Sequence, residues 1–214
     1  MPDFYTPEQT SRSRRVLAEI TREFPGAILI GGWGTWVRVN GAMSHDIDMI
    51  ISRADLGRLR SLTADLSESR HLAGRKWRAT RDGIHLDLYV PYDSRLGQRL
   101  ELRTEHLTAH AETTAGQRVL TIDAHIATKL AALLDRPDSR PGEKDRFELR
   151  ALLALGGDST PQVLTEASAR TIPELADLIS EAFGYLLELP GLSRTDRNAL
   201  RRTQTAWSTT LEDR

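Results

Sequence analysis

Two short apolar segments that contain aspartates constrain the fold more than any other feature of the sequence. Asp46 and Asp48 alternate with apolar residues in segment 46–51, and Asp87 does so in segment 83–90. Successive side chains of a strand point to opposite faces, so each segment predicts a strand with one apolar and one polar face. Strands disfavour aspartate, and three in this register favour a functional site over the alternative of ordinary surface carboxylates.

A glycine pair follows a third apolar segment. Residues 27–30 predict a buried strand, and Gly31-Gly32 then turns the chain into a short helix. Backbone N–H groups at the start of a helix suit phosphates, and residues without side chains let phosphates come close. The pair therefore indicates a phosphate-binding turn, although a glycine pair alone would predict only a turn. Trp33 and Trp36 on this helix either stack on a base or, as we favour, pack under the sheet.

The remaining segments predict a two-part chain. The expected elements are a helix that begins with a capping box at Thr6 and ends at Pro25-Gly26, a helix over 53–69, a hairpin of 76–80 with 83–90, a short strand over 118–122, and helices from Asp123 onward, one of them with a capping box at Thr171. The rest of segment 99–122 is hard to interpret. We therefore predict an α/β (α+β) fold, with a small mixed-sheet core over residues 1–122 and a helical domain over 123–214.

Composition narrows the class of protein. The chain has 29 basic and 30 acidic residues, so no global positive field draws it onto nucleic acid, and any such surface must be local. The absence of cysteine excludes disulfides, thiolate metal sites and a cysteine nucleophile. We find no signal-peptide pattern at the N-terminus and no apolar run long enough to span a bilayer. We expect a soluble, cytoplasmic protein with no membrane partner.

The three aspartates predict a metal site if their strands are neighbours. Converging carboxylates repel one another unless cations neutralise them. Hard oxygen ligands suit Mg²⁺, with Mn²⁺ as the alternative, and two such ions can clamp the attacking and leaving oxygens of a phosphoryl transfer.

Taken together, these residues resemble a known superfamily. Gly31-Gly32, the run Asp46-Ile47-Asp48-Met49 and a later strand aspartate, Asp87, resemble the signature of polymerase-beta-like nucleotidyltransferases. Further motifs resemble the lysine and lysine–aspartate motifs of AbiEii-type toxins, including the mycobacterial MenT proteins; they are Lys129-Leu130-Ala131-Ala132-Leu133, Arg136 and Lys144-Asp145-Arg146-Phe147-Glu148-Leu149. The resemblance covers residues 27–151.

The resemblance implies a role for each matching residue. Asp46 and Asp48 would bind metal and nucleotide phosphates, and Asp87 would complete the metal site or draw the proton from the acceptor hydroxyl. The residues implied to contact the NTP are Gly31, Gly32, Ser44, Lys129 and Lys144, with Asp145 orienting the lysines and Lys129 also in the catalytic set. Two of the chain's three lysines thus lie on motif positions. The alternative interpretation is that both are ordinary solvated residues on a helix. One departure is Ala42, where many family members have a basic residue.

The leading hypothesis is a toxin of a bacterial toxin–antitoxin pair, with a cognate antitoxin as partner. It would transfer NMP from an NTP to RNA, with the tRNA 3′ end as the expected acceptor, by in-line attack on the α-phosphate. In one alternative the reaction is the same, but the acceptor is a small molecule such as an antibiotic, or a protein side chain. The other is a catalytically silent binding module. A polyanion acceptor is favoured if basic residues line the site, and the candidates are Arg136, Arg140, Arg146 and Arg150; the alternative is that these arginines form a solvated helix face.

Overall fold

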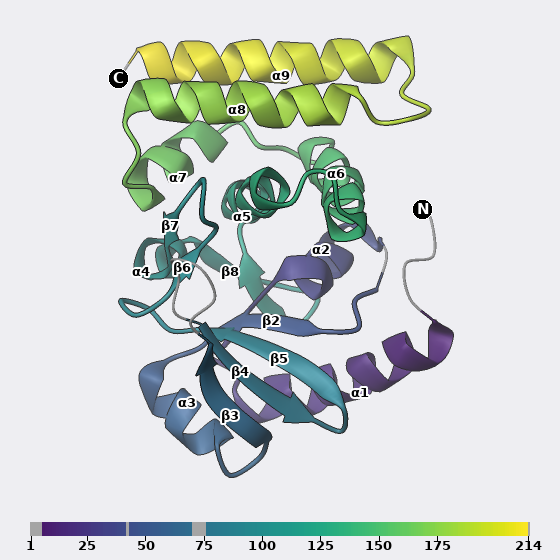
Figure 1. Cartoon of the computed structure of the whole chain (residues 1–214), viewed down its shortest axis with the longest axis vertical. Coiled ribbons are helices and arrows are strands. Elements are labelled where there is room, and N and C mark those ends of the chain that lie inside the picture. Colours follow the sequence, from purple (N-terminus) through teal and green to yellow (C-terminus); the bar gives the residue numbers. More distant parts are fainter. Residues whose placement is uncertain (1–5, 42, 70–75, 214) are drawn as a thin grey trace. The chain divides into compact units, whose positions relative to one another are not determined.

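The computed structural model describes residues 6–41, 43–69 and 76–213, so that Ala42 lies outside the described residues. The chain forms two compact units, one of residues 1–96 and 103–121 and the other of residues 97–102 and 122–214. The elements of the first unit are α1 (Pro7–Glu23), β1 (Ile28–Ile30), α2 (Gly31–Val39), β2 (Ile47–Ile50), α3 (Arg53–Leu59), β3 (Ala64–Ser69), β4 (Lys76–Arg81), β5 (Ile84–Tyr89), β6 (Arg95–Leu96), α4 (Thr104–Leu107), a 3-10 turn (Thr108–His110), β8 (Ala111–Thr114) and β9 (Gln117–Leu120) (Figure 1). Strand β7 (Leu102–Arg103) lies where the chain returns to this unit.

Within the described part of the first unit, seven strands form one sheet in the order β3-β4-β5-β2-β1-β9-β8. Strand β2 runs parallel to β5 and β1 runs parallel to β9, whereas the other neighbours are antiparallel. The prediction of a mixed-sheet α/β core is therefore confirmed. The segments that carry Asp48 and Asp87 are neighbours in this sheet.

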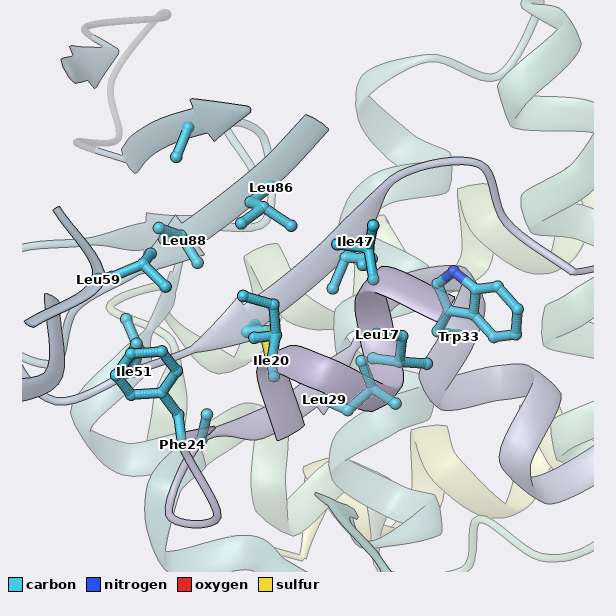
Figure 2. Packing of buried hydrophobic residues seen from close by; sticks show 14 of the residues in the cluster. Leu17, Ile20, Phe24, Leu29, Trp33, Ile47, Ile51, Leu59, Leu86 and Leu88 are labelled. Carbon is cyan, nitrogen blue, oxygen red and sulfur yellow. The ribbon is translucent and has the colours of Figure 1, made fainter. Parts of the chain in front are cut away.

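Helix α1 covers the apolar face of the sheet. Thr6 and Gln9 form the predicted capping box, in which the Thr6 N–H donates to Gln9 Oε1 at 3.1 Å. From this start, the buried α1 residues Val16, Leu17 and Ile20 recur at helical spacing and pack on alternate strand residues (Figure 2). The buried strand residues in this cluster include Leu29, Ile47, Met49, Leu86, Leu88 and Val119. The apolar residues beside the aspartates are thus committed to the core, as their alternation predicts.

The prediction of one helix over 53–69 is wrong. Helix α3 ends at Leu59, and the chain then forms edge strand β3, which pairs antiparallel with β4. Leu56 and Leu59 are buried, whereas Leu62, the next leucine at helical spacing, is 38 % exposed. Pairing of β3 with β4, the next strand along the chain, overrides the leucine spacing, because strand pairing depends on residues outside the segment itself.

The hairpin of β4 and β5 is as predicted. Asp82 and Gly83 both have positive φ, 50° and 73°, which the primed two-residue turns require. The turn fixes the register Arg78↔Asp87 and Thr80↔His85. In contrast, strand β8 was not predicted from the sequence; it pairs with β9 along the far edge of the sheet.

The second unit is helical, as predicted for the C-terminal part. Its helices are α5 (Ile122–Asp135), α6 (Arg140–Leu153), α7 (Thr160–Ala167), α8 (Ile172–Leu187) and α9 (Arg194–Glu212). The predicted capping box at Thr171 is present, with its N–H donating to Glu174 Oε2 at 2.8 Å. Helices α8 and α9 lie side by side (Figure 1), and the rings of Phe183 and Trp207 pack edge to face between them. Within the described ranges, every helix is too short or too polar to cross a membrane.

Candidate active site

Asp48 and Asp87 occupy paired positions on neighbouring parallel strands. The register of β2 and β5 places Asp48 opposite Asp87, while the flanking Ile47 and Met49 are fully buried on the other face. Paired residues of adjacent strands have their side chains on the same face, at a Cβ separation of about 5 Å. The structure therefore brings these two carboxylates to one small area of the sheet.

Gly31 lies directly against the carboxylate of Asp48. It follows Ile30, which pairs with Asp48 across β1 and β2, and it begins helix α2 with a φ of +62°. A Cβ atom at this position would lie 2.2 Å from Asp48 Oδ2 and 2.8 Å from Asp48 Cγ. Both the backbone conformation and the contact demand glycine here. The first residue of the glycine pair and the second aspartate are thus parts of one site.

We predict that Gly31→Ala perturbs this site more than its backbone strain alone explains. The left-handed conformation costs alanine about 1 kcal/mol, and the Asp48 carboxylate must also move. Gly116→Ala is the matched control, because Gly116 has a φ of +74° and an added Cβ would meet no atom within 4 Å. Urea denaturation should show a larger loss of unfolding free energy for Gly31→Ala. Equal losses would show that the Gly31–Asp48 contact is relaxed at no cost.

Ser44 contacts Asp46 two residues before Asp48. The buried Ser44 hydroxyl donates to Asp46 Oδ1 at 2.5 Å, and Asp46 itself is half-buried just before β2 begins. Ser44 therefore orients a carboxylate in this structure. Its predicted contact with a triphosphate stays a prediction.

Asp87 is neutralised by two cations of strand β4. Lys76 Nζ donates to Asp87 Oδ2 at 2.6 Å, and Arg78 Nε donates to Asp87 Oδ1 at 2.8 Å. The hydrogen bond and charge of Asp87 raise the pKa of Arg78, and Asp48 adds to this effect. Neither cation was predicted as a site residue from the sequence, although residues two apart on a predicted strand share a face. We expected repulsion among the carboxylates to be relieved by metal ions, but protein cations balance the charge of Asp87.

The carboxylates of this site can supply some, but not all, of the ligands of a metal ion. Among the described residues, no group of three or more histidines, aspartates or glutamates is placed to hold a metal ion. Asp46 and Asp48 nevertheless supply hard oxygens on either side of Ile47. Mg²⁺ is commonly bound by one or two carboxylates together with substrate phosphates, so a pair of aspartates fits a metal that shares its ligands with a nucleotide.

In the helical unit, the motif lysines belong to a buried ion-pair network. Lys129 Nζ donates to Asp145 Oδ1 at 3.0 Å and also to Glu148, while Lys144 Nζ lies 3.6 Å from Glu148 Oε1. Burial would lower the pKa of Lys129, but the charges of Glu148 and Asp145 outweigh it and raise that pKa. Asp145 also accepts from Arg136. The resemblance implied phosphate contacts for both lysines, and these stay predictions; Glu148, at the centre of the network, had been given no role.

The arginines named as a candidate polyanion surface are largely engaged within the same unit. Arg136 pairs with Asp145, Arg150 lies 3.4 Å from Asp196, and Arg146 donates to the Pro137 carbonyl and lies over the Tyr185 ring. These contacts are typical of a structured helix surface. The helical unit therefore gives little support to a polyanion acceptor.

The two tryptophans after the glycine pair pack as we favoured. Trp33 is buried, its Nε1–H donates to Ser13 Oγ at 2.9 Å, and its ring meets Trp36 edge to face (Figure 2 shows Trp33). Arg14 lies over the Trp36 ring at 5.4 Å. Trp33 is therefore a core residue that anchors α2 to α1.

Comparison with known proteins gives distant structural similarity alone. No family model matches the chain, and no curated protein matches it. JHP933 from Helicobacter pylori aligns over 98 % of this chain and 96 % of its own, with 16 % identity and a TM-score of 0.46. A Helicobacter pylori protein named provisionally as a nucleotidyltransferase aligns over 98 % of both chains, with 15 % identity and a TM-score of 0.44. An antigenic nucleotidyltransferase-like protein from Paracoccidioides brasiliensis aligns over 92 % of this chain and 93 % of its own, with 15 % identity and a TM-score of 0.45. We draw no functional conclusion from similarity at this level.

Proposed function

We propose that this protein is a metal-dependent nucleotidyltransferase. The observation that carries the proposal is the contact between the carboxylate of Asp48 and the positive-φ Gly31 at the start of α2. It places a carboxylate beside the N-terminus of a helix, where the partial positive charge suits an anion. The Asp48 carboxylate favours a cation, and the N-terminus of α2 favours an anion. Together they match a substrate in which a metal ion is bound to phosphates.

Different residues of the first unit would bind the metal ion and the phosphates of such a substrate. Asp46 and Asp48 would hold Mg²⁺, or Mn²⁺ in its place, and the N–H groups at Gly31-Gly32 would receive the phosphates. The metal would polarise the α-phosphate and stabilise the leaving pyrophosphate. Ser44 keeps the Asp46 carboxylate oriented through its 2.5 Å hydrogen bond. The protein's contribution is positioning and charge balance.

For the acceptor, we propose RNA, with the tRNA 3′ end as the first candidate. The resemblance of Gly31-Gly32, Asp46, Asp48 and Asp87 to the nucleotidyltransferase signature, and of the 129–149 motifs to AbiEii-type toxins, supports this choice. The same resemblance supports a toxin that acts in the cytoplasm with a cognate antitoxin. The ion pairs of Lys129 and Lys144 add no structural support, so in the second unit the proposal rests on the motif resemblance alone.

A transfer assay tests this function. Purified protein is incubated with each of the four α-³²P-labelled NTPs in turn, total tRNA and an excess of Mg²⁺ over NTP. We expect label to appear in tRNA with at least one NTP and to disappear when EDTA removes the metal. Unlabelled tRNA with all four NTPs contradicts tRNA as the acceptor. Label on a small molecule or on the protein instead would keep the chemistry and change the acceptor.

A further inference from the structure

Four charged residues lie in a row across three strands of the first unit. Asp48 of β2 pairs with Asp87 of β5, and Asp87 pairs with Arg78 of β4. Lys76 lies two residues before Arg78 on β4 and contacts the same carboxylate. With Gly31 beside Asp48, the order along the sheet is glycine turn, Asp48, Asp87, then the two cations.

The two cations have donors beyond those that Asp87 uses. Arg78 donates through Nε, and among the described residues its two terminal nitrogens make no hydrogen bond. The Lys76 ammonium carries three N–H groups and, within the same ranges, makes a single hydrogen bond, to Asp87 Oδ2. The Arg78 side chain is 51 % exposed and that of Lys76 is 18 % exposed. Asp87 thus fixes two cations in place and leaves their remaining donors available to a ligand.

The position of Lys76 and Arg78 relative to the glycine turn indicates whether they lie on the acceptor side or on the pyrophosphate side of the reacting phosphorus atom. In an in-line displacement the acceptor oxygen and the leaving pyrophosphate lie on opposite sides of the phosphorus atom. If pyrophosphate lies at the glycine turn, the acceptor approaches from the side of Asp87 and β4. Two cations against one carboxylate leave a net positive charge on that side. An anionic acceptor fits this charge, and a polycationic one does not.

We propose that Lys76 and Arg78 form a binding site for backbone phosphate of a nucleic-acid acceptor. The inference rests on the proposed nucleotidyl transfer, because that reaction defines the acceptor side. Asp87 acts as a positioning residue that holds both cations toward the acceptor. A guanidinium with two unused nitrogens offers a bidentate contact to phosphate oxygens, and the ammonium adds a point charge.

Salt-dependent binding tests this site in the absence of NTP and metal. A 5′-fluorescein-labelled single-stranded RNA of about 12 nucleotides is titrated with wild type, Lys76→Gln, Arg78→Gln and the double variant at several KCl concentrations, with anisotropy as the readout. Each lost phosphate contact should lower the slope of log K against log salt by about 0.7, and the double variant should lose about 1.4. Lys76→Arg and Arg78→Lys should keep most of the slope, whereas loss through misfolding would not be rescued.

Arg12→Gln is the matched control, because its side chain is 48 % exposed and lies on α1, which covers the opposite face of the sheet. Its slope should equal that of wild type. A DNA strand of the same sequence should lose the same slope as RNA, because the site contacts the phosphodiester backbone.

Three outcomes would overturn the inference. They are an unchanged slope in the double variant, an equal loss in Arg12→Gln, and a drop in Mg·NTP affinity as large as the drop in RNA affinity, which would assign the cations to the nucleotide. The proposed function itself fails by another readout, the absence of NMP transfer. The two failures are therefore distinguishable.

Discussion

Replacing Asp48 with asparagine is expected to lower the rate of NMP transfer by about 10³-fold, which corresponds to about 4 kcal/mol of transition-state stabilisation. Asparagine has nearly the same shape as aspartate and can remain against Gly31, so the fold should be unchanged. The loss comes from the missing charge, since an amide oxygen is a weaker ligand for a hard cation than a carboxylate. A single-turnover assay with saturating Mg·NTP measures the effect on the chemical step.

Asp82→Asn is the control for this substitution. Asp82 lies in the β4–β5 turn at a φ of 50°, where asparagine is also tolerated, and its side chain is 53 % exposed. We expect transfer within about 2-fold of wild type, since surface substitutions usually change little. A rate for Asp48→Asn within 10-fold of wild type (about 1.4 kcal/mol) would show that this carboxylate does not hold the reacting metal.

Lys129→Met is expected to destabilise the protein by about 3–5 kcal/mol at neutral pH, because it leaves Asp145 and Glu148 buried without their principal cation. Adding Glu148→Gln to this variant removes one of the unpaired charges and should restore part of the lost stability. Urea denaturation of the two variants and wild type measures these free energies. A loss below 1 kcal/mol would show that neighbouring cations or water replace Lys129.

The pH dependence of this contribution follows from the direction of the pKa shift. The folded-state pKa of Lys129 is raised above its ordinary value of 10.5, so its stabilisation is fully present below pH 10.5. As pH rises further toward the folded-state pKa, the stabilisation is lost. The difference in unfolding free energy between wild type and Lys129→Met should therefore be constant from pH 7 to about 9.5 and shrink at higher pH. A difference that already halves by pH 9 would contradict the raised pKa.

Local signals made much of the fold predictable. Apolar alternation around Asp48 and Asp87 identified two strands of the sheet, and capping boxes at Thr6 and Thr171 identified the starts of two helices. The helix predicted over 53–69 failed where pairing of β3 with β4 decided the structure. Such pairing depends on the residues of a second segment, here the next strand along the chain, and no periodicity within 53–69 alone reveals it.

The candidate site was predictable to the same extent. Gly31 and Asp48 were found from local pattern, and the structure adds that they are in contact. Lys76, Arg78 and Glu148 were missed because their importance comes from partners elsewhere in the chain. A charged residue on an isolated strand or helix has the same local signal whether it is solvated or paired. Charge partners become visible once the register of neighbouring strands or helices is known.

Calorimetric titration of a nonhydrolysable NTP analogue tests the central claim most directly, namely that Asp48 and Gly31 form a binding site for a metal–nucleotide complex. We expect wild type to bind the analogue with Mg²⁺ and to lose this binding in EDTA, and we expect Asp48→Asn to bind it about 10²-fold more weakly with Mg²⁺. Binding that is equally tight without metal, or equally tight in Asp48→Asn, would contradict the claim.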